Sequence, residues 1–106
     1  INLATNGSYT FGTAAATSMT AGDSAFEVSV DNANIANTIT INANGSILER
    51  DSAAASLFRV IRVTGGTLIL GNAWVRNGSN SFLGGGIRVD TGGALTMYNS
   101  TVSNNF

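Results

Sequence analysis

The feature that most constrains the fold is an internal repeat in the second half of the chain. Residues 61–77 return in nearly the same order as residues 87–104, at a spacing of 26 and then, after one inserted residue (Asp90), of 27. Both segments read Ile-Arg-Val, Thr-Gly-Gly, apolar-x-apolar, Asn, Val and Asn. Repeats of roughly 20 to 30 residues with short strands are typical of solenoids, because no unit buries its apolar face alone. The two segments are therefore predicted to stack on each other.

Within the last repeat, apolar and polar residues alternate in three short runs. These runs are residues 87–89, 95–97 and 101–103, and glycine pairs or polar residues that include Asn separate them. Alternation with a period of two predicts strands, and the separators predict turns. No tight two-residue hairpin joins the runs, so they suit one coil of a parallel β-solenoid.

Weaker alternation in the first half predicts further strands. We expect strands at residues 8–11, 25–30, 38–41 and 46–49, and a loop at residues 50–56. Residues 13–19 fit a coil, a short cap helix or a weak strand, and these alternatives stay open. A change of alternation between residues 57–60 and 61–63 indicates a bend or bulge.

Together these patterns predict an all-β chain folded as a parallel β-helix of about four coils. At 106 residues, it is expected to form a single β-solenoid domain over residues 1–106. The strongest repeats lie in residues 57–106, and residues 1–24 are expected to form an irregular first coil or a cap.

Stacked coils predict columns of equivalent side chains. The expected inward columns are Ile39 with Ile61 and Ile87, Leu68 with Leu95, Leu70 with Met97, and Val75 with Val102. Each aliphatic residue buried in such a column contributes about 1.5–3 kcal/mol.

Glycine and asparagine are expected to form the corners between strands. Glycine accepts a positive φ without strain, and stacked asparagine amides can bond from one coil to the next. The predicted corner positions are residues 65–66 and 92–93, with amide ladders of Asn72 over Asn99 and Asn77 over Asn104.

The composition excludes several classes of chemistry. The chain has no His and no Cys, so Ser-His-Asp and Cys-His nucleophiles, thiolate metal sites and disulfides are ruled out. Only 10% of the residues are charged and the formal net charge is −1, so nothing attracts the chain electrostatically to nucleic acid or anionic lipid. The apolar runs are too short to cross a bilayer. We expect no nucleic acid partner, no membrane insertion and no cofactor.

The carboxylates give little support to an enzyme. A glycosidase needs two facing carboxylates about 5–9.5 Å apart, and no two of the six share a repeat column. Surface or turn-capping roles are expected for Asp23, Glu27, Asp31, Glu49, Asp51 and Asp90. Asp31 with Asn32 and Asn34 also fits a calcium ligand set, although an Asx turn explains the cluster. We therefore expect no enzymatic activity.

Two outward arginines are expected to stack in neighbouring coils. Arg62 over Arg88 places like charges together, which is unfavourable unless Glu27, Asp90 or a partner lies near. The pair suits an acidic sugar as well as a solvated strand face. A polysaccharide-lyase-like β-helix is therefore kept as an alternative.

Two aromatic residues extend that alternative to sugar binding. Trp74 and Tyr98 can stack on sugars if they are exposed. Trp74 aligns with Thr101, a polar residue that is expected to point outward. A carbohydrate-binding β-helix therefore remains a second alternative function.

The repeats resemble those of a known family. Gly-Gly-Gly-Ile, Thr-Gly-Gly, Leu-Thr-Met and Asn-Ser-Thr-Val-Ser-Asn-Asn, within residues 84–105, are similar to the β-helix repeats of bacterial polymorphic outer membrane proteins and autotransporter-type adhesins. The resemblance covers residues 57–106. It implies a right-handed coil and a structural or adhesive protein, secreted or held at a bacterial or archaeal cell surface. The related pectin-lyase-like folds include carbohydrate-active enzymes.

The ends of the chain carry the prediction of function. Neither end shows a capping helix or a charged cover, which exposed strand edges in a solenoid require. A head-to-tail contact between copies is heterologous and builds an open fibre. We predict such stacking between copies, through Ile1, Leu3, Tyr9 and Phe11 at one end and Leu95, Met97, Val102 and Phe106 at the other. The alternatives are a fragment of a longer adhesin passenger, and binding to a surface polysaccharide or a host ligand.

Overall fold

The computed structural model describes residues 1–19, 21–30 and 36–106 and shows an all-β chain. The described residues contain ten strands and no helix. The strands are β1 (Ser8–Phe11), β2 (Ser24–Val28), β3 (Thr38–Asn42), β4 (Ile47–Arg50), β5 (Arg59–Val63), β6 (Gly66–Gly71), β7 (Trp74–Arg76), β8 (Ile87–Val89), β9 (Gly93–Tyr98) and β10 (Thr101–Val102).

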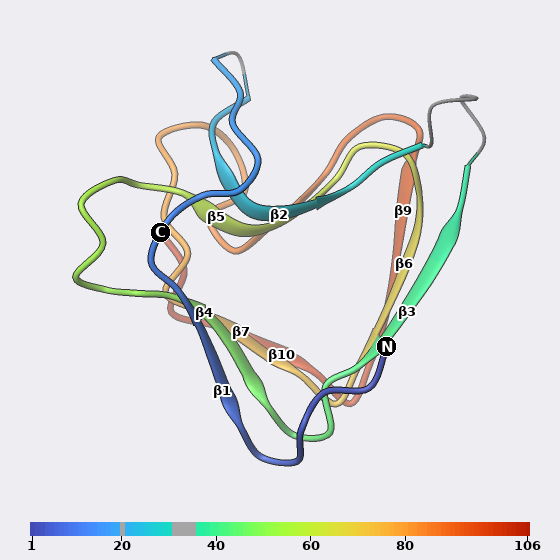
Figure 1. Ribbon diagram of the computed structural model, residues 1–106. Helices are drawn as coiled ribbons and strands as arrows, with labels where there is room; N and C mark the ends of the chain where they lie inside the picture. The colour runs from blue at the N-terminus through green and yellow to red at the C-terminus, as the bar shows by residue number, and fades with distance from the viewer. Residues whose placement is uncertain (20, 31–35) are drawn as a thin grey trace.

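The ten strands form three parallel sheets around one core. The sheet orders are β1-β4-β7-β10, β2-β5-β8 and β3-β6-β9, so each strand from β1 to β7 pairs with the strand three places later in the chain. The chain therefore visits the three sheets in the same order three times and returns to the first sheet with β10. Each such visit is called a round, and the three rounds are β1 to β3, β4 to β6 and β7 to β9. Figure 1 shows the sheets as the three sides of a triangle, with β1 in front of β4, β7 and β10.

The register confirms the repeat of the second half. Ile61 pairs with Ile87, and Arg62 pairs with Arg88 on the outward side. The other predicted inward pairs are also in register, namely Leu68 with Leu95, Leu70 with Met97, and Val75 with Val102.

The predicted place of Ile39 in these columns is wrong. Ile39 pairs with Leu68 in the third sheet, whereas Ile61 stacks on Phe26 in the second. Both sheets have the same inward-outward alternation, so the alternation around Ile39 could not tell one sheet from the next. Ile39 and Ile61 therefore belong to strands of two different sheets, and the number of residues between them is not a repeat length.

The core consists of inward side chains from the middle layer and their neighbours. Leu68, Leu70 and Val75 are fully buried, as are Val60, Ile61 and Val63. On the strands of the first and last rounds, most of the equivalent apolar side chains are only half-buried and pack against this core, although Val28 and Ile41 are buried. The middle layer is thus covered from both sides, and the end layers from one side.

Asparagine and glycine make the corners, as predicted. Gly66 and Gly92 have φ of 71° and 93°, but Gly65 and Gly93 do not share the positive φ expected of both pairs. A side chain at Gly66 would collide with the backbone of Asn37, so only glycine fits there.

The corner asparagines lie in turns, as predicted, but their side chains make different bonds from those expected. Positive φ occurs in the described residues at Asn6, Asn44, Asn72, Asn77, Asn99 and Asn104. The Asn72 amide donates to Oδ1 of Asn42 at 3.0 Å, and the Asn77 amide donates to Glu49. The expected ladders to Asn99 and Asn104 are therefore replaced by bonds toward the preceding round.

Irregular segments connect some of the strands. Residues 13–19 contain no helix; Ala16 instead forms an antiparallel bridge with Ser24. Residues 51–58 form the predicted loop, and the N–H groups of Val60 and Ile61 both donate to Gly86 O at 3.0 Å. This shared acceptor marks the predicted bulge. The proposed calcium cluster of residues 31–34 lies outside the described residues.

Candidate assembly faces

The strands of the first round leave an apolar hollow at one end of the core. Leu3, Tyr9 and Phe11, three of the four residues predicted for this end, are half-buried and line it. The hollow has a volume of about 280 Å³ and is completed by Phe26, Ile41 and Leu48. Its lining is apolar, and the Tyr9 hydroxyl accepts a bond from the Ala4 N–H at 2.9 Å.

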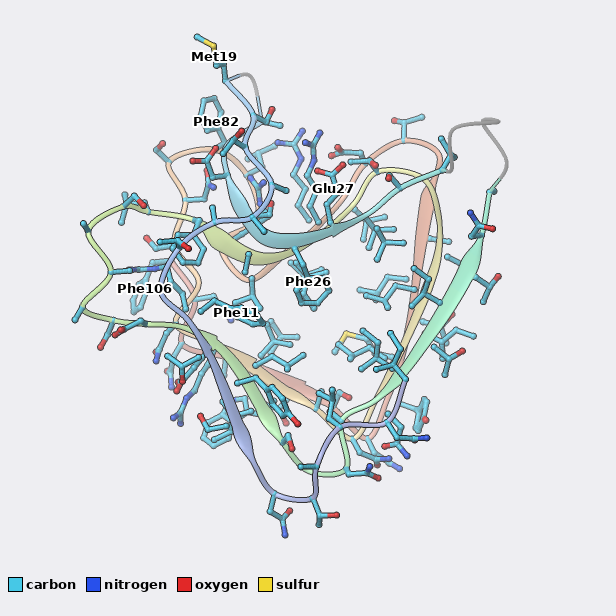
Figure 2. All side chains as sticks on the ribbon, viewed as in Figure 1. Phe11, Met19, Phe26, Glu27, Phe82 and Phe106 are labelled. Carbon is cyan, nitrogen blue, oxygen red and sulfur yellow. The ribbon has the colours of Figure 1, made fainter. Side chains whose placement is uncertain are left out.

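Two phenylalanines dominate this N-terminal face. Figure 2 shows Phe11 and Phe26 projecting into the space between the three sheets, with ring centroids 6.0 Å apart and planes inclined by 53°. Ile1, the fourth predicted residue, is 71% exposed. Phe26 was assigned to a strand but not to this face, because its pairing with Ile61 was not recognised.

The opposite end of the core is also apolar and incompletely covered. Leu95 and Met97 are half-buried and pack against the core from one side. Val102 and Phe106 are 44% and 77% exposed. Leu95, Met97 and Val102 thus belong to the last strands, β9 and β10, and Ile87, which was not predicted for this face, also packs against the core there. Figure 2 shows Phe106 outside the space between the three sheets.

The C-terminal face also presents unpaired backbone groups on β10. The N–H groups of Thr101 and Ser103 donate to Ala73 O and Val75 O of the preceding round, at 2.9 and 3.1 Å. Successive N–H groups of a strand point to opposite sides. The N–H of Val102 therefore points away from β7, toward the free edge of the sheet.

The edges at the N-terminal face are partly covered by the chain itself. Residues 1–3 run along the end of β3, where Leu3 N–H donates to Asn42 O at 2.9 Å. Ala16 covers the start of β2 through its bridge with Ser24. The side of β1 away from β4 has no strand partner among the described residues.

The outward arginines form a compact charge cluster on the second sheet. Arg62 bonds Asp90 Oδ2 at 2.5 Å and lies 3.6 Å from Glu27, while Arg88 Nε bonds Asp90 Oδ1 at 2.6 Å. Burial raises the pKa of Asp90, but the hydrogen bonds from Arg62 and Arg88 outweigh burial and hold that pKa below its usual value. Glu27 and Asp90 thus compensate the stacked like charges, as the sequence required.

A second cluster surrounds Glu49 on the first sheet. Its carboxylate accepts bonds from Arg76 at 2.6 Å, Asn77 at 3.1 Å, Thr10 at 3.1 Å and Ser8 at 3.3 Å. The Arg76 hydrogen bond lowers the pKa of Glu49; burial opposes this effect, but the Thr10 bond adds to it, so the pKa stays below its usual value. These contacts join three successive rounds.

The Glu49 cluster predicts acid sensitivity. Because the folded pKa of Glu49 is below its unfolded value of about 4.3, its stabilisation is present above pH ~4.3 and is lost as pH falls through the folded pKa. We expect Glu49→Gln to lower Tm at pH 7, and the difference from wild type to shrink toward pH 3. Thr10→Val, which removes one donor, should give a smaller loss at pH 7. A pH-independent Glu49→Gln effect would contradict this assignment. Thermal unfolding by circular dichroism measures each case.

Sequence reasoning missed a buried arginine that links the rounds. Arg59 is fully buried, and its guanidinium donates to five acceptors, which are Gly84 O, Gly22 O, Ser24 Oγ, Ala21 O and Leu83 O. Burial lowers the pKa of Arg59, and the charges of Arg88 and Arg62 add to that effect. The only sequence signal was the break in alternation around it.

No group of three or more acidic, histidine or cysteine side chains suited to a metal occurs within the described ranges. In the same part of the chain, no helix is long and apolar enough to cross a membrane. No protein-family model matches the chain, and comparison with curated proteins and with solved structures also gave no match. The resemblance to bacterial surface repeats therefore remains a prediction.

Proposed function

We propose that the chain is a structural β-solenoid that stacks end to end with copies of itself into an extracellular or cell-surface fibre. Its three rounds and the start of a fourth are the coils, and a right-handed coil follows from the family resemblance. The observation that carries the proposal is the pair of half-buried apolar faces at opposite ends of one core. Each face adjoins strand edges that have free backbone groups, so a further layer can bury the apolar residues and pair the edges.

The layers define how two copies fit. The first sheet has four strands and the other two have three, so β10 extends one layer beyond its neighbours. A translation of four layers, about 19 Å at ~4.8 Å per layer, brings β1 of the next copy against β10. Residues 1–3 of that copy, which already lie beside its β3, then lie beside β9. Ala16 and residues 1–3 of the next copy, which cover parts of its β2 and β3, thus lie in the fourth layer beside β8 and β9, where the first copy has no strand.

The side chains brought together by this translation are alike. Within one copy, Tyr9, Leu48, Val75 and Val102 form one inward column, because each pairs in register with the next. The translation places Tyr9 of the next copy directly after Val102 in this column. Ile1 of the next copy follows Met97 in the same way. Outward, polar Ser8 meets polar Thr101. This match of apolar with apolar and polar with polar favours a second copy over an unrelated partner.

Val102→Pro tests the proposal at the free edge. Proline lacks the N–H that points outward from β10, but leaves the bonds of Thr101 and Ser103 to β7 in place. We expect the wild-type chain to form fibres with a ~4.8 Å reflection along the axis and a repeat near 19 Å, and Val102→Pro to remain monomeric. Electron microscopy, fibre diffraction and sedimentation velocity measure these outcomes.

Val102→Ile is the matched control, because it keeps both the N–H and the apolar side chain, and it should form fibres as wild type does. Circular dichroism checks that all three proteins are folded. A folded wild-type chain that stays monomeric at every concentration would contradict self-stacking. It would favour the alternative in which the coils of a longer adhesin passenger cover the faces. Release of unsaturated sugars from an acidic polysaccharide would favour the lyase-like alternative.

A further inference from the structure

A second feature lies on the side of the molecule, at a corner between two sheets, and is not one of the two assembly faces. The corner between the third and first sheets is hollowed, with a volume of about 470 Å³. Thr5, Asn44, Asn72, Asn99 and Trp74 line it, together with two small residues. None of the lining residues is charged, whereas the ion pairs of Arg62 and Arg76 lie outside the lining.

The aromatic ring in this hollow is held in place. Trp74 is 37% exposed, and its indole N–H donates to Ser103 Oγ at 2.7 Å. The Arg76 guanidinium lies 4.7 Å from the ring centroid and is itself bonded to Glu49. One face of the indole is therefore occupied by a cation whose charge is already paired, and the ring is fixed before any ligand arrives.

The amides in the hollow are spaced along the axis. Asn44, Asn72 and Asn99 come from successive rounds and share the left-handed conformation, with φ of 52°, 54° and 47°. Successive layers are ~4.8 Å apart, close to the advance of one sugar unit in an extended glycan. No hydrogen bond from a described residue engages the Asn99 side-chain amide, which is exposed.

We propose that this corner binds a neutral, extended oligosaccharide that runs along the axis of the stack. An aromatic ring packs on the apolar face of a pyranose, while side-chain amides both donate to and accept from its hydroxyls. The absence of charge in the lining favours a neutral glycan over an acidic one. Because the corner lies beside the stack and not at its ends, it stays open in a fibre.

The single tryptophan of the chain reports on this binding directly. Titration with cellohexaose and with chitohexaose should produce a saturable change in Trp74 fluorescence with at least one of them. Asn99→Gly should weaken that binding about three- to tenfold, because it removes one amide that bonds the ligand. Trp74→Ala should abolish binding of the oligosaccharide, which isothermal titration calorimetry measures because this variant has no tryptophan fluorescence.

Asn104→Gly is the matched control. Asn104 has a similar φ of 54° at another corner, so glycine is equally compatible with its backbone, and binding should be unchanged. Equal weakening by both variants, or no response to either hexasaccharide, would overturn the proposal. Binding of polygalacturonate that is lost in Arg62→Gln would also overturn it, by moving the site to the charged second sheet.

Discussion

Replacing Arg59 by methionine is expected to destabilise the folded chain by about 3–5 kcal/mol, the cost of removing one partner from a buried charged network. For a chain of this size, each kcal/mol corresponds to a fall in Tm of about 4–8 °C. The expected fall is therefore at least about 12 °C. Urea unfolding followed by circular dichroism, at concentrations where the chain is monomeric, measures the free energy.

The size of this effect follows from where the five acceptors lie. Gly22 O and Ser24 Oγ belong to the first round, and Gly84 O belongs to the third. Arg59 begins β5 in the round between them. Methionine fills much of the space but leaves Gly22 O and Ser24 Oγ without this donor at buried positions, and Gly84 O without it at a half-buried one. Removal of these hydrogen bonds therefore weakens the packing of the three rounds against one another.

Arg62→Met is the matched control on the same strand. Arg62 points outward, is partly exposed, and pairs with Asp90 and Glu27. Exposed ion pairs contribute about 0–1 kcal/mol, so this variant should lose much less stability than Arg59→Met. Equal losses in the two variants would show that removal of any arginine, and not the network of bonds to Arg59, causes the effect.

The sequence could predict the second half of the fold because its rounds are nearly equal in length. The pairing of Leu68 with Leu95 and of Val75 with Val102 follows from a constant spacing, and both pairs are in register. Two-residue periodicity then assigns the inward side chains. Leu95, Met97 and Val102, three of the residues predicted for the C-terminal face, follow from the same spacing.

The first half could not be predicted in this way because its loops differ in length. Ser8 pairs with Ile47, which lies 39 residues later (47 − 8), whereas Ile47 pairs with Trp74 at the shorter spacing of 27 residues (74 − 47). With the spacing unknown, Ile39 was placed in the wrong sheet. Arg59 was missed for a different reason, since four of its five acceptors are backbone carbonyls, which no residue type reveals.

The position of a side chain along the stack should determine how much a cavity costs. Leu68 is fully buried in β6, between Ile39 and Leu95. We expect Leu68→Ala to destabilise the monomer by about 2–5 kcal/mol, the range for large-to-small changes in a core. Ile69→Ala, on the outward side of the same strand, should cost about 1 kcal/mol or less.

Leu95→Ala makes the same chemical change in the last layer, where the side chain is covered from one side only. In dilute solution it should cost clearly less than Leu68→Ala, because less apolar surface leaves the core. If copies stack as proposed, the next copy covers the end of the core that contains Leu95, so the variant should raise the concentration needed for assembly as well as lower stability. Urea unfolding of monomers and sedimentation of fibres measure the two effects separately. If Leu95→Ala costs as much as Leu68→Ala in the monomer and leaves assembly unchanged, the C-terminal face is not the surface that receives the next layer.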